Sequence, residues 1–163
     1  MKRLNEKFLK TINEKSFRQD FINMIELKNI LDYVKNIVYN PKYKRNIIME
    51  TKSSLKSYFG FKEGKSKIII CPSAFLLDFH PKLEDFLSTL TYHEGFHAKE
   101  NFEGIINLEP SYMDMGAYLE FGIKKELRAC RNQVINFNQN NSEIFKKRIY
   151  RNIQEYEKRL RDL

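Results

Sequence analysis

Apolar residues recur at helical spacing along most of the chain, which predicts a mainly helical protein. The first such stretch runs from Phe17 to about Tyr39 and ends before Pro41, because the residue preceding a proline disfavours the helical conformation. Its apolar positions are Phe17, Phe21, Ile25, Leu27, Ile30, Leu31, Val34, Ile37 and Val38. A second, weaker helical pattern covers residues 47–58.

One short run has the composition of a strand. Residues 67–71 read Lys-Ile-Ile-Ile-Cys and are followed by Pro72. Branched residues bounded by a proline are typical of β-strands. We therefore expect an α+β protein that is mainly α, a helical single domain with a small β element.

The next helix is predicted to begin at Pro81, because proline fits the first helical position, where its missing N–H is no loss. Glu84 and Asp85 then complement the positive end of the helix dipole, and the helix is expected to end near Gly104. Its inner apolar stripe consists of Leu83, Phe86, Leu87 and Leu90.

Two more helices follow. One begins between residues 111 and 114 and reaches about Phe137, with an inner stripe of Leu119, Ile123, Leu127, Cys130, Val134 and Phe137. Ser142 opens the last helix as a capping residue, and its stripe is Phe145, Ile149, Ile153, Tyr156, Leu160 and Leu163. This narrow stripe would suit a cap on the domain, pairing with a second copy, or a removable cover over a cleft.

The run from His93 to His97 carries the pattern His-Glu-x-x-His within a predicted helix. Two histidines four residues apart project from one helical face, and their neutral imidazole nitrogens suit Zn²⁺. Glu94 lies beside them, where it can handle the proton of a water molecule at the metal. All three side chains fall on or near the apolar face of the helix, so they are expected to point inward. This pattern is typical of a catalytic zinc site.

A catalytic zinc needs a third protein ligand. The acidic candidates downstream are Glu100, Glu103, Glu109, Asp114, Glu120 and Glu126. We favour Glu126 because it sits within the apolar stripe of its helix, where an unpartnered carboxylate would cost several kcal/mol. An ion pair with a neighbour such as Arg131, or with a basic residue from another helix, is the alternative interpretation of that position.

The chain resembles the gluzincin metallopeptidases, and in size it is similar to the small single-domain minigluzincins. The residues that carry the resemblance are His93, Glu94 and His97 together with Glu126 in the stretch Glu-Leu-Arg-Ala. The resemblance implies a zincin-like active-site helix, zinc ligands at His93, His97 and Glu126, and an edge strand at residues 67–71 that pairs with an extended substrate. It covers residues 67–139.

The chain departs from the family at one position. Many gluzincins place an aspartate directly after the Glu-x-x-Ala stretch to orient a zinc-binding histidine, and here that position is Cys130. Another partner is then needed for the histidine, and Asp114 or Glu120 could serve.

The resemblance implies hydrolysis of peptide bonds by a zinc-activated water, with Glu94 as general base and acid. The developing negative charge on the substrate oxygen needs a donor, and the candidates are Tyr112, Tyr118, His80 and Arg128. For His80 the structural reading is a residue of the helix entrance, and for Cys71 it is a buried thiol.

The net charge of +8 arises from 29 Lys and Arg against 21 Asp and Glu. These basic residues are spread along the chain without a phosphate-binding loop or an aromatic RNA-binding motif, so we read them as solvated faces and do not expect nucleic acid as a partner. Two distant cysteines imply no disulfide framework. No apolar run is long enough to span a membrane, and a cytoplasmic protein acting on a peptide or protein substrate is expected.

We divide the expected single domain into a helical segment at residues 1–60, a zincin-like catalytic core at 61–140 and an amphipathic helix at 141–163. Because the last segment lies outside the resemblance, it is a candidate cover that would keep the peptidase latent. The alternative function is a basic helical binding protein whose metal site is structural or vestigial.

Overall fold

The computed structural model describes residues 33–39, 49–52, 66–70, 79–103, 110 and 114–163. Helices make up most of these residues, so the prediction of a mainly α protein is confirmed. The helical segments are α4 (Leu83–Ser88), η2 (Thr89–Glu94), α5 (Gly95–Phe102), α6 (Met115–Ile135) and α7 (Glu143–Arg161). None of the helices in the described ranges is both long and apolar enough to cross a membrane.

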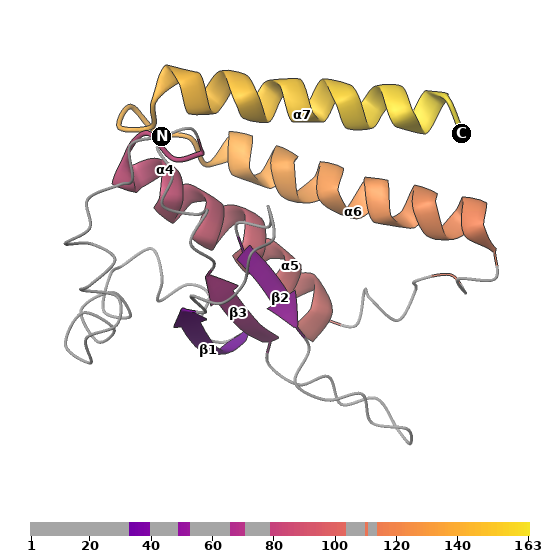
Figure 1. Ribbon diagram of the computed structural model, residues 1–163, viewed down its shortest axis with the longest axis horizontal. Helices are drawn as coiled ribbons and strands as arrows, with labels where there is room; N and C mark the ends of the chain where they lie inside the picture. The colour runs from indigo at the N-terminus through magenta and orange to yellow at the C-terminus, as the bar shows by residue number, and fades with distance from the viewer. Residues whose placement is uncertain (1–32, 40–48, 53–65, 71–78, 104–109, 111–113) are drawn as a thin grey trace.

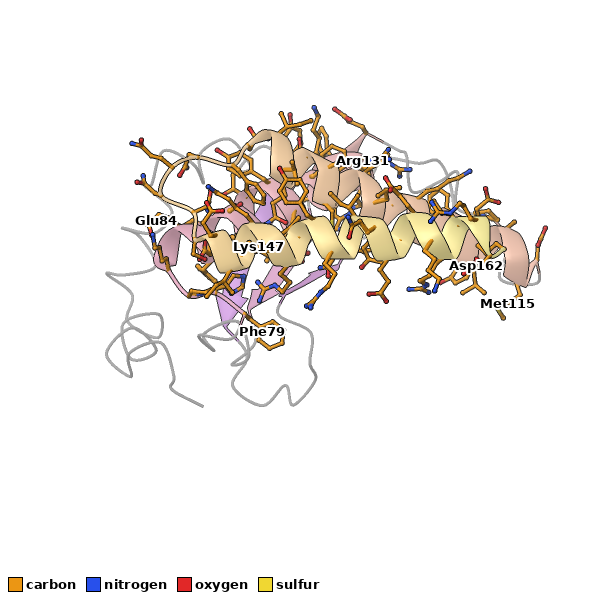
Figure 2. The ribbon with its side chains drawn as sticks, turned by 90° about the horizontal axis from the view of Figure 1, so that it is seen from above. Phe79, Glu84, Met115, Arg131, Lys147 and Asp162 are labelled. Atoms are coloured by element: carbon orange, nitrogen blue, oxygen red, sulfur yellow. The ribbon has the colours of Figure 1, made fainter. Side chains whose placement is uncertain are left out.

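The elements stack in layers (Figure 1). Helix α7 lies along α6, the continuous segment from α4 through η2 to α5 crosses beneath α6, and a small sheet lies on the other side of that segment. Seen from above, Met115 at the start of α6 and Asp162 just after α7 lie at the same end of the pair, so the two helices are antiparallel (Figure 2).

The described sheet has three strands, β1 (Val34–Tyr39), β2 (Met49–Lys52) and β3 (Ser66–Ile70), in the order β1-β3-β2. Strand β3 pairs in parallel with β1 and antiparallel with β2. Ile68 at the middle of β3 is fully buried. Because β3 has a neighbour on each side, the expectation that residues 67–71 form an edge strand is wrong; the edges of this described sheet are β1 and β2.

Two helix predictions are wrong where the structure can test them. Residues 34–39 form β1 instead of the end of a helix, and residues 49–52 form β2. The sequence Val-Lys-Asn-Ile-Val-Tyr is rich in branched and aromatic residues, and pairing with β3 satisfies its backbone, so tertiary context outweighs a helical periodicity. Apart from Tyr33, the rest of both predicted helices lies outside the described residues. The two strands show that the segment 1–60 is not uniformly helical.

The entrance to α4 is set by Asp85. The backbone N–H of Lys82 donates to the Asp85 carboxylate over 3.1 Å, which makes Lys82 the capping residue and Leu83 the first helical residue. Pro81 therefore precedes the helix instead of occupying its first position. The predicted starts of the later helices are confirmed, because Asp114 caps α6 and Ser142 caps α7 through their side chains.

The core between α6 and α7 contains Cys130, Phe145 and Ile149, with partly buried side chains packed against them from Val134, Phe137, Ile153 and Tyr156. His80 is also buried, and its ring lies against Phe145 while its Nε2 atom is 2.9 Å from the Thr89 hydroxyl. The first half of α7 is therefore part of the folded core.

Candidate metal centre

Three successive helical segments bring three metal-ligating side chains together. His93 comes from η2, His97 from α5 and Glu126 from α6, and their ligand atoms all lie within 4.8 Å of one another. One carboxylate oxygen of Glu126 lies 3.3 Å from Nε2 of His93, and the other lies 3.3 Å from Nε2 of His97. The carboxylate thus sits between the two imidazoles.

The histidine pair lies on a segment that is wider than an α-helix at its centre. Residues Thr89–Glu94 form a π-helical turn, in which the N–H of Gly95 donates to the carbonyl of Leu90. The Thr89 hydroxyl donates back to the carbonyl of Asp85 over 3.2 Å, a contact that perturbs regular helix. The sequence pattern predicted one continuous helix here and did not reveal this turn.

Helix α6 holds the widened turn in place. The side-chain amide of Asn132 donates to the carbonyl of Tyr92 over 2.7 Å, and the amide of Gln133 donates to the Thr89 hydroxyl over 3.2 Å. Asn132 and Gln133 lie less than two turns after Glu126 on α6. The helix that supplies Glu126 is therefore also fixed against the segment that carries both histidines.

The group is closed on one side and open on the other. The side chain of His97 is 7 % exposed and that of His93 is 15 % exposed, whereas the Glu126 side chain is 40 % exposed. Solvent therefore reaches the group from the Glu126 side. A catalytic metal needs such an accessible position for water, whereas a purely structural site is enclosed by protein ligands.

The three side chains alter one another's pKa values strongly. Burial lowers the pKa of His93, but contacts with Cys130 and Glu126 and the charges of Glu94 and Glu126 raise it well above 6.5. Burial also lowers the pKa of His97, but contacts with Glu100 and Glu126 raise it above its ordinary value. Burial raises the pKa of Glu126, yet the two imidazoles hold it far below its usual range. Without metal, protons on the histidines supply the positive charge that the carboxylate requires.

The donor atoms suit zinc. Nε2 of His97 is buried, and its 3.3 Å approach to Glu126 lacks the geometry of a hydrogen bond, although a buried polar atom normally forms one. Ligand atoms on a tetrahedral zinc, each about 2.0–2.1 Å from the metal, are roughly 3.3 Å apart. The two His–Glu distances of 3.3 Å match that spacing. Two imidazole nitrogens and one carboxylate are also a common ligand set for this metal.

The other acidic candidates for a ligand have different surroundings. Glu103 forms an ion pair with Lys99, Glu120 forms one with Lys124, and Asp114 caps α6. Glu109 lies outside the described residues. Arg131, one of the alternative partners considered for Glu126, pairs instead with Glu157 over 2.8 Å.

The groups that lie close to the Nδ1 atoms of the two histidines differ from those expected. Asp114 and Glu120 are engaged elsewhere, so the expectation that one of them orients a histidine is wrong. Instead, Sγ of Cys130 lies 3.9 Å from Nδ1 of His93, at the position where the family resemblance places an aspartate. Glu100 approaches Nδ1 of His97, with 3.8 Å between the nearest atoms.

Several candidates for an oxyanion donor can be located. His80 is buried beside Thr89, Arg128 is paired with Glu100, and Tyr118 is 39 % exposed on α6. Tyr112 and the thiol of Cys71 lie outside the described residues. The sequence reasoning missed Tyr156 of α7: burial, followed by the charges of Glu126 and Cys130, raises its pKa to about 12, so its hydroxyl stays protonated near the group. In the sequence, Tyr156 was recognised only as one residue of the apolar stripe of the last helix.

Comparison with known proteins adds no relative: no protein-family model, curated protein or solved structure matches this chain.

Proposed function

We propose that this protein is a zinc-dependent metallopeptidase of the gluzincin type. The observation that supports this most directly is the convergence of His93, His97 and Glu126 on one partly open point. A zinc ion held there would act as a Lewis acid and make a water molecule nucleophilic near neutral pH. The three side chains would hold the ion, and the exposed side of Glu126 would admit water and substrate.

Glu94 would carry the proton in this reaction. It is the last residue of the π-helical turn, is only partly buried, and its charge helps to raise the pKa of the neighbouring His93. A carboxylate in that position accepts a proton from the attacking water and returns it to the leaving amine. Tyr156, with its raised pKa, would remain a hydrogen-bond donor throughout the working pH range.

An extended peptide is the substrate that the fold suits. Strand β2 lies against η2, which carries His93, and it is an edge of the described sheet. The unpaired backbone groups on a strand edge can bind an extended peptide by forming one more strand. Such binding would bring a peptide backbone alongside the metal ligands without demanding a particular side chain.

The rival function is a basic helical binding protein whose metal site is structural or vestigial, and a structural zinc requires a closed site with four protein ligands. The residues described by the structure provide three grouped ligands, and one of these, Glu126, is 40 % exposed. Both features favour the catalytic alternative.

The test is zinc content combined with digestion of a broad peptide library. The purified chain should bind about one zinc per molecule and cleave peptides, and His93→Ala or His97→Ala should lose both properties. The exposed Glu103→Ala serves as the matched control on the same segment. A folded wild-type chain that takes up no zinc after refolding with the metal would overturn the proposal.

A further inference from the structure

Unsatisfied buried polar atoms gather behind His97. Six buried side-chain nitrogen or oxygen atoms among the described residues have no hydrogen-bond partner. Four of the six belong to a row of three residues, namely both ring nitrogens of His97, Oε2 of Glu100 and Nη2 of Arg128. Because a buried polar atom normally has a hydrogen-bond partner, such a cluster indicates a contact that forms in another state of the protein.

The row has a defined geometry. Nδ1 of His97 and Oε2 of Glu100 are 3.8 Å apart, so both atoms lack a partner while facing one another. Nε of Arg128 donates to the other oxygen of Glu100 over 2.5 Å. The side chain of Glu100 is 5 % exposed, and Arg128 supplies the positive charge that a buried carboxylate needs. Arg128 thus holds Glu100 at the back of the His97 ring.

This arrangement has a recognised use in metal sites. A histidine that binds a metal through one ring nitrogen usually donates the N–H of its other nitrogen to a carboxylate, which fixes the ring's orientation and strengthens the ligand. Nε2 of His97 faces Glu126 and the proposed zinc, so Nδ1 is the nitrogen left to donate. Closing the 3.8 Å gap by about 1 Å would give a normal hydrogen bond.

We propose that Glu100 is a positioning residue for His97 and that Arg128 is the residue that keeps Glu100 in place. The proposal rests on the metal centre proposed above and adds to it two residues, Glu100 and Arg128, that control its affinity for metal. The helix supports it directly, because Glu100 follows His97 by one turn of α5 and the two side chains share a face. With a metal held at Nε2, the ring proton of His97 would be on Nδ1, from which it would be donated to Glu100.

The experiment measures metal affinity without any substrate, by competition of zinc and cobalt with a chelator. Glu100→Ala should weaken binding by about 10- to 100-fold. Glu100→Gln, which keeps the size and one acceptor oxygen, should weaken it less. Arg128→Ala should also weaken it, and Arg128→Lys should recover part of the loss. The matched control is Glu103→Ala, because Glu103 is exposed and forms an ion pair with Lys99.

A spectroscopic readout separates positioning from a general loss of stability. Nitrogen NMR of the zinc-loaded wild type should show His97 protonated at Nδ1, with a proton shift typical of a strong hydrogen bond, and this signal should change in Glu100→Gln even if the variant melts normally. An unchanged His97 signal, or unchanged metal affinity in folded Glu100→Ala, overturns the proposal. A chain that binds metal with the expected affinity ratios but cleaves no peptide supports Glu100 and contradicts only the peptidase.

Discussion

The hydroxyl of Ser142 donates to the carboxylate of Asp85 over 2.6 Å, and this contact ties the start of α7 to the first turn of α4. The backbone N–H of Ser142 donates to the same carboxylate over 2.9 Å, and Asp85 itself is fully buried. One turn later, Phe145 is fully buried as well. Helix α7 is therefore attached to the segment that carries the histidines, which changes the expectation that it is a removable cover.

A chain shortened to end at Asn141 should consequently lose stability instead of gaining activity. It would lose Phe145 and leave Asp85 without its Ser142 donors, and removal of a buried phenylalanine side chain alone costs about 3–5 kcal/mol. Circular dichroism melting of the shortened and full-length chains checks this. If the shortened chain melts cooperatively and cleaves peptides faster than the full chain, α7 is a latency element after all.

The role of Glu94 can be separated from metal binding. Glu94→Gln should retain zinc, because the three ligand side chains are untouched, and should slow peptide hydrolysis by about 10²- to 10⁴-fold. Zinc analysis and turnover are measured on the same preparation, with Glu103→Gln as an exposed control on the same segment. Loss of zinc from a folded Glu94→Gln variant would make Glu94 a ligand and contradict its proposed role.

The third ligand can be tested on one helix. Glu126→Ala should weaken zinc binding strongly, since its carboxylate oxygens lie 3.3 Å from both histidines. Glu120→Ala should leave zinc binding nearly unchanged, because Glu120 is exposed and paired with Lys124. Both variants remove a carboxylate from α6, so helix propensity is matched. If Glu120→Ala weakened zinc binding more than Glu126→Ala did, the assignment of Glu126 as the third ligand would be wrong.

The pH dependence of stability should change when zinc binds. In metal-free protein the raised pKa of His93 and of His97 contributes stability that is present below pH 6.5 and is lost as pH rises through the raised values. The lowered pKa of Glu126 contributes stability that is present above pH 4.5 and is lost as pH falls through the lowered value. Metal-free protein should therefore be most stable from about pH 4.5 to 6.5.

Zinc must displace the protons on the histidines, so its stabilising effect should increase as pH rises. Melting temperatures measured with a chelator and with zinc should differ little near pH 5 and most near pH 8. A larger zinc effect at the acidic end would mean that the raised histidine pKa values do not govern metal binding.

The sequence predicted those parts of the fold that depend on local pattern. The capping residues Asp114 and Ser142 marked the starts of α6 and α7. The spacing of apolar residues along α6 predicted that Glu126 lies on its inner face, and Glu126 does lie against the histidines. The prediction failed at β1, because a short run with branched residues fits either element until its partner strand is known. The place of Glu100 was also not predictable, since its role depends on Arg128, which is distant in sequence.

The π-helical turn at Thr89–Glu94 takes up one residue more than an α-helix does over the same rotation. Deleting one residue there, such as Thr91, would favour a regular α-helix and leave α5 in nearly the same rotational phase relative to α4. His97 would then still face Glu126 while the helix stayed continuous. A deletion variant with full helix content should still bind zinc, and loss of zinc would contradict this. Evolution could therefore gain or lose the widened turn by inserting or deleting a single codon without losing the centre.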